Sequence, residues 1–491
     1  MKNYRKTPLM GWASWNCFFT DISEEIMKEQ ADALVKTGLA DCGYTYLNMD
    51  DGFFGGRDEN GRVLPHKERF PNGIKVVADY AHSLGLKAGT YTDGGDNTCG
   101  HYYNKECENG EGVGLYGHEE GDLRRYLIED GFDFIKVDWC GGVRMGLDDE
   151  EQYTKIGSII DDIREETGRC IVYNICRWQF PGPWAAKVAD SWRTGADIAR
   201  SFDSVLYQLD MIKPLARYCS PGHVNDLDMM QIGNGLTHDE EKAHFAMWCM
   251  MSTPLMIGCD LTKIPDETLE ILKNKKLIAI NQDSACLQAF VIKELRDDEG
   301  TLVGEVWIKD LGKKKSEEKA VAFLNRSNEL LGFDFDLAEA GLHGICGFEE
   351  LTDEGAAEIN GESVSCELRP HCCAVYRVNA KEATPVVNRD DKGEVEHKAI
   401  EKISREEADE LVRNGAYLVD VRSTDEYEKG HLDGAINIPY SDIHGQAPRF
   451  IPDRDAHVVL YCATGKRSTQ AYRVMEFLNY KNTHYLGGVE L

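Results

Sequence analysis

The chain has 491 residues, of which 42% are hydrophobic, 47 are glycine and 14 are proline. This composition is typical of a folded globular protein that is too long for a single core. Its 85 acidic and 55 basic residues give a formal net charge of -30, which argues against nucleic acid or an anionic membrane as a partner and leaves a neutral ligand as the easier choice.

Neither a membrane-spanning apolar run nor the apolar core of a signal peptide is present, so we expect a cytoplasmic protein. The 16 cysteines show no metal-ligand spacing. In a reducing compartment most of them should be buried thiols.

Up to about residue 285, an apolar stretch, a polar or glycine-rich break and an amphipathic segment alternate eight times. The expected strands are 9–15, 44–50, 86–93, 132–138, 170–176, 191–195, 223–229 and 254–260. Helical patterns such as 23–38, 73–85 and 150–168 separate them and end on glycine. Eight such units predict an α/β fold with a (β/α)8 barrel over residues 1–285, rather than an open sheet.

The pattern changes after the barrel. Residues 286–380 contain alternating strands with Gly, Asp and Asn turns and no long helix, which predicts an all-β domain. The polar, aperiodic stretch 381–397 is interpreted as a linker. In 398–491, short apolar strands alternate with helical segments, which indicates a small α/β domain.

Polar and aromatic side chains gather where the barrel strands end. In chain order they are Trp12, Trp15, Asp50, Asp51, Asp93, Lys136, Asp138, Asn174, Arg193, Asp197, Asp226 and Asp228. In barrels this end of the strands carries the active site. One such aspartate alone is more commonly a helix cap or an Asx turn, but carboxylates at several strand ends, together with tryptophans, suit a neutral polyhydroxylated ligand.

Several blocks carry a specific resemblance. "TPLMGWASWN", "YTYLNMDDGF", "FDFIKVDWC", "WRTGADI" and "NDLDMMQIGNG", in this order, resemble the signature blocks of glycoside hydrolase family 27, the α-galactosidases and α-N-acetylgalactosaminidases. The resemblance covers residues 7 to 285. It implies a retaining, exo-acting hydrolase of terminal α-linked galactose in oligosaccharides or glycoconjugates, followed by an antiparallel β-sandwich. No motif for a metal, nucleotide or flavin is found, so we expect no cofactor.

The resemblance also assigns the catalytic pair. Asp138 in "KVDWC" matches the nucleophile, and Asp197 in "WRTGADI" matches the general acid/base. Retaining enzymes hold two such carboxyl groups about 5 to 5.5 Å apart, one ionised and one protonated. We expect Lys136 and Arg193 to keep Asp138 charged, while burial and a negative neighbour raise the pKa of Asp197.

Other positions match contacts to the sugar. Asp50 and Asp51 resemble the pair that binds the O4 and O6 hydroxyls and selects galacto-configured sugars. The further expected substrate contacts are Trp15, Lys136, Asn174, Arg193 and Asp228. Cys99 and Cys140 resemble the family's active-site disulfide; we expect them to be reduced in the cell yet close enough to bridge on oxidation.

One position departs from the family. Where α-galactosidases have a glutamate for the 2-hydroxyl, and N-acetylgalactosaminidases a serine, this chain has Arg177. Arginine can only donate hydrogen bonds and is large. Either the pocket binds galactose differently, or it takes a galactoside with a 2-substituent or an acidic aglycone, or Arg177 points outward.

The C-terminal region carries a second resemblance. "LVDVRSTDEYEKGHLDGAINIPY" and "YCATGKRSTQAYRVMEF" resemble a single-domain rhodanese. Cys462 ends a strand in a loop that leads into a helix, where backbone N–H groups favour the thiolate. The six-residue loop from Cys462 to Arg467 has the length found in sulfurtransferases, which implies a persulfide on Cys462, stabilised by the loop and by Arg467, and a sulfur donor and acceptor as partners. A regulatory or vestigial module is the alternative.

Two further alternatives stay open for the whole chain. It could be a sulfur-transfer protein whose barrel only binds carbohydrate. It could also be an α-N-acetylgalactosaminidase or a β-L-arabinopyranosidase of the same family, whose substrates share the axial O4. Oligomeric state cannot be inferred from the sequence, although association into homo-oligomers is common for barrels with such a β domain.

Overall fold

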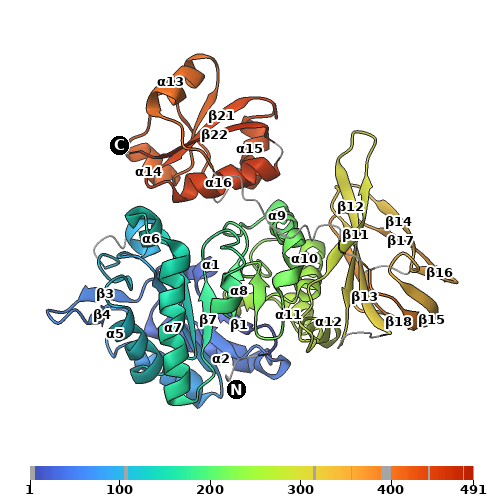
Figure 1. The fold of residues 1–491 in the computed structure, drawn as a ribbon, viewed down its shortest axis with the longest axis horizontal. Helices are drawn as coiled ribbons and strands as arrows, with labels where there is room; N and C mark the ends of the chain where they lie inside the picture. Colours follow the sequence, from blue (N-terminus) through green and yellow to red (C-terminus); the bar gives the residue numbers. More distant parts are fainter. Residues whose placement is uncertain are drawn as a thin grey trace.

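The computed structural model describes residues 6–103, 109–312, 317–354, 357–386, 388, 400–440, 443–478 and 480–489. They form three parts: a barrel, an antiparallel β domain and a C-terminal α/β domain (Figure 1). Most of the linker expected at 381–397 lies outside the described residues, and the last strand of the β domain continues through Ala383.

All eight expected barrel strands are confirmed. They are β1 (Met10–Ala13), β2 (Tyr46–Asn48), β5 (Lys87–Asp93), β6 (Phe134–Asp138), β7 (Val172–Ile175), β8 (Ser191–Arg193), β9 (Val224–Asp226) and β10 (Leu255–Ile257). The strands are parallel in the order β10-β1-β2-β5-β6-β7-β8-β9. A parallel bridge between Met230, just after β9, and Ile257 in β10 brings the two edges together, so the sheet curls into a barrel with all strand ends on one rim.

Helices follow the strands around the outside. They include α2 (Glu24–Lys36), α3 (Lys75–Ser83), α5 (Glu119–Arg124), α7 (Asp149–Thr167), α9 (Phe202–Ile212), α10 (His238–Met251), α11 (Asp266–Leu272) and α12 (Lys275–Asn281). Short helices α1 (Trp15–Phe18), α4 (Cys99–Tyr103), α6 (Cys140–Met145) and α8 (Ala185–Val188) begin in the loops after β1, β5, β6 and β7. The start of α7 is fixed by Asp148, whose side chain accepts from the backbone N–H of Glu151.

A two-stranded hairpin after β2 was not predicted. It consists of β3 (Phe54–Arg57) and β4 (Val63–Pro65). Its first strand contains two glycines and only one buried residue, so it lacks the apolar run that identified the other strands.

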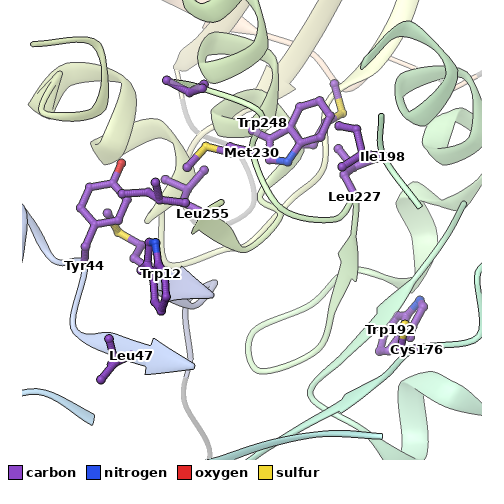
Figure 2. Packing of buried hydrophobic residues seen from close by; sticks show 14 of the residues in the cluster. Trp12, Tyr44, Leu47, Cys176, Trp192, Ile198, Leu227, Met230, Trp248 and Leu255 are labelled. Atoms are coloured by element: carbon purple, nitrogen blue, oxygen red, sulfur yellow. The ribbon is translucent and has the colours of Figure 1, made fainter. Parts of the chain in front are cut away.

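Two hydrophobic clusters pack the barrel. The smaller one includes Ala13 and Phe134. The larger one, part of which Figure 2 shows, includes Trp12, Trp192 and Trp248. These three indole rings are fully buried, and each indole N–H has an acceptor: the carbonyl of Cys259, the side chain of Asn225 and the carbonyl of Asp228, respectively. Buried tryptophans with a satisfied N–H stabilise a core.

The β domain is a sandwich of two antiparallel sheets. One contains β11 (Phe290–Arg296), β12 (Leu302–Asp310), β13 (Glu318–Asn325), β18 (Cys373–Ala383) and β15 (Leu342–Glu350), and the other contains β14 (Leu331–Asp336), β17 (Ser363–Leu368) and β16 (Glu358–Asn360). Side chains such as Phe323 and Phe333 fill the space between the sheets, whereas Trp307 and Val375 belong to the barrel's cluster. The sandwich therefore packs on the barrel through a shared apolar surface.

The C-terminal domain has a parallel sheet in the order β20-β19-β21-β22, from β19 (Tyr417–Asp420), β20 (Ile436–Asn437), β21 (His457–Cys462) and β22 (Asn482–Gly488). Its helices are α13 (Arg405–Arg413), α14 (Thr424–Lys429), α15 (Ile443–Phe450) and α16 (Lys466–Phe477). A separate hydrophobic cluster covers each face of this sheet. Figure 1 shows α16 along the edge of this domain that faces the barrel.

Within the residues that the structure describes, no helix combines the length and the apolar character that crossing a membrane requires. The expected location of the protein stays a prediction.

Candidate active site

Asp138 lies at the end of β6 and is 4% exposed. One carboxylate oxygen accepts from the backbone N–H of Trp139 at 2.9 Å and from the indole N–H of Trp178 at 3.1 Å. The other accepts from the hydroxyl of Tyr91 at 3.3 Å. Three donors from different elements hold this carboxylate in one orientation, as a nucleophile requires.

Asp197 follows β8 and is held by that strand's last residue. The guanidinium of Arg193 donates to Oδ1 of Asp197 at 3.2 Å and lies 2.8 Å from Oδ2 of Asp228. Arg193 thus lies between the predicted acid/base and a predicted substrate contact. Burial, together with the charges of Asp197 and Asp226, raises the pKa of Asp228 to about 6 against the opposing effect of Arg193.

Asp50 and Asp51 follow β2, and Lys136 lies near the end of β6, on the other side of β5. The ammonium of Lys136 lies 2.8 Å from Oδ2 of Asp50. Asp51 accepts from the backbone N–H groups of Gly52 and Gly100, each at 2.7 Å. Burial raises the pKa of Asp51 to about 7, although these hydrogen bonds oppose the shift. The expected pair of adjacent carboxylates is therefore present on the rim.

Asn174 and Trp15 lie at different depths. Asn174 donates to the Ser191 hydroxyl and to Asp226, both at 2.8 Å, and lines a small internal cavity of about 50 Å3 inside the barrel. Trp15 lies at the rim of the barrel, where it packs edge to face against Phe19 and lines a larger cavity. Trp15 is accordingly placed to meet a ligand that enters the barrel.

Arg177 points away from this centre. Its Nε donates to Oδ2 of Asp149 in α7 at 2.8 Å. Among the described residues, Arg177 lines neither the internal cavity nor the cavity at the rim. The structure therefore corresponds to the outward-pointing alternative.

Cys99 and Cys140 form a disulfide with their Cα atoms 5.4 Å apart. Asp93 lies beside them and accepts from the backbone N–H groups of Cys140 and Gly141 at 2.6 and 3.0 Å. Burial and the charge of Asp138 raise the pKa of Asp93 to about 8. The ligand atoms of Asp93, Cys99, Asp138 and Cys140 lie within 4.8 Å of one another, but the disulfide leaves only two carboxylates for a metal.

Sequence reasoning did not select Trp178 or Tyr91 as site residues. Tyr91 lies two positions before Asp93 on β5, so the period of two residues along a strand places both side chains on the same face. Trp178 has a left-handed backbone with φ of 58°, and Asp228 has φ of 78°. For residues other than glycine this conformation is strained, and such strain is common at functional sites.

The C-terminal domain has its own candidate centre at the end of β21. Cys462 is fully buried, and its sulfur accepts from the backbone N–H of Gly465 at 3.1 Å. The loop residue Arg467 donates to both carboxylate oxygens of Glu426, at 2.5 and 2.9 Å. The loop is therefore folded around the sulfur as expected, while the role of Arg467 at Cys462 stays a prediction.

Comparison with known proteins identifies both regions. Residues 7–283 match the family described as alpha galactosidase A, and residues 404–490 match the rhodanese-like domain. The chain belongs to the α-galactosidase family. It is 39% identical over 344 residues to alpha-galactosidase A of Cellvibrio japonicus, covering 67% of this chain and 79% of that relative.

Two further comparisons support this family assignment. The α-galactosidase of Oryza sativa subsp. japonica is 36% identical over 377 residues, which cover 76% of this chain and 84% of the relative. The crystal structure of alpha-galactosidase I from Mortierella vinacea superposes with a TM-score of 0.68 at 25% identity and covers 78% of this chain and 100% of that one. The expected glycoside hydrolase family 27 fold and the C-terminal rhodanese-like domain are thus confirmed.

In this member of the α-galactosidase family, the rhodanese-like domain contacts the candidate active site. The hydroxyl of Tyr440 donates to the carbonyl of Asp197 at 2.7 Å, and the Gln470 amide donates to Oδ2 of Asp197 at 3.3 Å. The ammonium of Lys466 lies 3.0 Å from the sulfurs of both Cys99 and Cys140. Nothing in the local sequence pattern of these three residues indicated such contacts.

These contacts overturn one expectation. Burial alone would raise the pKa of Asp197, but the charges of Lys466, Arg193 and Lys136 outweigh it, so the pKa of Asp197 is lowered. The predicted rise was wrong because Lys466, which comes from another domain, adds a positive charge that the barrel sequence does not reveal.

Proposed function

We propose that this chain is a retaining exo-α-galactosidase that hydrolyses terminal α-linked galactose from oligosaccharides or glycoconjugates. The observation that carries the proposal is the pair of carboxylates at the barrel rim, one at the end of β6 and one after β8, with β7 between these strands. Asp138 is fixed by three donors, and Asp197 is held by Arg193, in a chain that belongs to the α-galactosidase family.

In this proposal, Asp138 attacks the anomeric carbon while Asp197 gives its proton to the departing glycosidic oxygen. The bond to the aglycone breaks as the ester to Asp138 forms. In the second step, Asp197 takes a proton from water, whose oxygen attacks the anomeric carbon and releases Asp138. The two displacements give net retention of configuration.

The remaining rim residues would hold the galactose. Carboxylates at Asp50, Asp51 and Asp228 accept hydrogen bonds from hydroxyls, and Lys136 and Arg193 donate them. Because the side chain of Arg177 is paired with Asp149, the substrate does not need a bulky substituent at the sugar 2-position to contact it. An α-galactoside with a free 2-hydroxyl is the simplest substrate that fits.

We propose a second activity for the rhodanese-like domain: transfer of sulfane sulfur through a persulfide on Cys462. The sulfur is buried and accepts from the backbone N–H of Gly465, in the loop that leads into α16. A small sulfur donor and a thiophilic acceptor would be its partners.

The first activity is tested by initial rates on p-nitrophenyl α-galactoside, α-N-acetylgalactosaminide and β-L-arabinopyranoside. Asp138→Asn is the blank, and Asp79→Asn, an exposed carboxylate paired with Lys75 on α3, is the matched control. We expect the α-galactoside to react fastest and Asp138→Asn to lose at least about 1,000-fold in kcat. Equal rates for Asp138→Asn and the native chain would refute the assignment.

A further inference from the structure

One side chain of the rhodanese-like domain reaches into the barrel. Lys466 belongs to the loop that surrounds Cys462, yet its ammonium lies 3.0 Å from both sulfurs of the Cys99–Cys140 disulfide and 4.0 Å from the centre of the Trp178 ring. The whole residue is only 7% exposed. Figure 1 shows the domain above the strand ends of the barrel, with α16, which begins at Lys466, facing it.

The position of this ammonium is close to the predicted nucleophile. Oδ2 of Asp138 and Nζ of Lys466 are each 3.0 Å from Sγ of Cys99, so the two atoms are at most 6.0 Å apart. A retaining glycosidase places the anomeric carbon between carboxyl groups that are about 5 to 5.5 Å apart. Lys466 and Asp197 also line the same cavity, so Lys466 is near both of the carboxyl groups between which the sugar ring must bind.

The predicted acid/base is engaged by the same domain. Gln470 donates to Oδ2 of Asp197, and Tyr440 donates to the carbonyl of Asp197. In catalysis that carboxyl group must carry a proton and give it to the glycosidic oxygen. Gln470 holds the carboxyl group as an acceptor instead, and the nearby positive charges lower the pKa of Asp197, which favours the ionised form.

Access to the site leads past the same residues. A cavity of about 800 Å3 between the two domains is lined by Asp197 and Trp15 from the barrel and by Tyr440, Lys466 and Gln470 from the rhodanese-like domain. Among the described residues, Asp197 lines this cavity and Asp138 does not. A ligand in the cavity therefore meets the acid/base but is separated from the nucleophile.

The charges explain why a lysine is stable there. A buried ammonium is costly unless opposite charges surround it. The charge of Lys466 acts on both Asp93 and Asp197, and Asp138 lies nearby. A neutral sugar gives these carboxylates hydroxyl donors, whereas Lys466 gives them a cation, so the two compete for one set of acceptors.

We propose that the rhodanese-like domain is an intramolecular inhibitor of the galactosidase, with Lys466 occupying the space of the bound sugar. This inference rests on the proposed α-galactosidase function. Binding of a galactoside requires the loop to withdraw Lys466, and docking of the loop excludes the galactoside. If the domain is docked in about nine molecules of ten, the apparent affinity for the sugar falls about tenfold.

The test uses the full chain and compares Lys466→Ala and Lys466→Met with the native protein on p-nitrophenyl α-galactoside. Lys481→Ala, an exposed lysine of the same domain, is the matched control. We expect kcat/KM to rise about tenfold in Lys466→Ala, mainly through KM. Lys466→Met keeps the side-chain length without the charge and should lie between the two. An unchanged or lower kcat/KM in Lys466→Ala overturns the proposal.

Galactose affinity, measured by titration calorimetry, separates this inference from the proposed function. If no variant hydrolyses the substrate but Lys466→Ala binds galactose more tightly than the native chain, occlusion stands and the activity assignment fails. If the native chain is active and neither Lys466→Ala nor Gln470→Ala binds galactose more tightly, the activity stands and the inhibitor is refuted. Gln470→Ala, which removes the hydrogen bond to Oδ2 of Asp197, covers the case in which Lys466→Ala does not fold.

Discussion

Arg177 donates to Asp149 at 2.8 Å, although its neighbour Trp178 donates to Asp138. Consecutive residues thus point in different directions, one toward α7 and one toward the predicted nucleophile. This arrangement removes the arginine from the position where the family's glutamate would meet the sugar 2-hydroxyl.

We therefore expect Arg177→Ala to change kcat/KM for p-nitrophenyl α-galactoside by less than about threefold. The ion pair is partly exposed, so its loss should lower the free energy of unfolding by about 0.5 to 1 kcal/mol. Asp149→Ala should give the same small effects. A loss of activity of about 100-fold in Arg177→Ala alone, about 2.7 kcal/mol of transition-state stabilisation, would place Arg177 in the substrate pocket.

Asp197→Ala should slow hydrolysis of an activated aryl α-galactoside and respond to azide. Without a general base, water reacts slowly with the glycosyl ester on Asp138, whereas azide needs no base. The product should be α-galactosyl azide, identified by NMR. In Asp138→Ala, the azide product should have the β-configuration. If azide accelerates neither variant, the two assigned roles are wrong.

Cys462→Ser should abolish thiosulfate:cyanide sulfur transfer, because the persulfide can form only on that sulfur. Cys346→Ser, at an exposed cysteine of the sandwich, is the control and should keep the activity. The buried Cys462 sulfur accepts from its own loop, so we expect galactoside hydrolysis to continue in Cys462→Ser. Loss of both activities would show that the domains are coupled through this loop.

Lys309 should make stability depend on pH in alkaline solution. It is fully buried at the joint between the sandwich and the barrel, where it donates to Ser252 and to two carbonyl groups. Burial lowers its pKa to about 8, against about 10.4 in the unfolded chain. Between these values the unfolded state binds more protons, so stability rises with pH.

The measurement is the urea midpoint of the native chain at pH 8, 9 and 10. The part of the rise that comes from Lys309 should be absent in Lys309→Met and present in Lys293→Met, a more exposed lysine on the neighbouring strand. Identical pH profiles in all three proteins would show that Lys309 titrates normally.

The barrel could be predicted because its strands are buried on both faces. In β1, β2 and β7 every residue is buried, and such short apolar runs stand out between amphipathic helices. The rim carboxylates follow from the same pattern, because parallel strands of a barrel end on one face. The hairpin of β3 and β4 was missed because its glycines and half-exposed residues resemble a loop.

The docking of the third domain could not be predicted. Local pattern indicates where Lys466 lies in its loop, but not that the loop faces Asp138 across several hundred residues of sequence. For the same reason, the direction of the pKa shift of Asp197 was wrong, because the charge that decides it comes from another domain. The direction of Arg177 had been left open, since its partner Asp149 lies on a helix 28 residues earlier.

The sandwich and the rhodanese-like domain differ in whether they share a hydrophobic cluster with the barrel. The sandwich contributes Trp307 and Val375 to the barrel's hydrophobic cluster, so deleting the sandwich would expose apolar side chains of the barrel to water. The hydrophobic clusters of the rhodanese-like domain contain only residues of that domain. It contacts the barrel through hydrogen bonds from side chains such as Tyr440 and Gln470. The rhodanese-like domain could therefore be exchanged for another domain without rebuilding the core of the hydrolase.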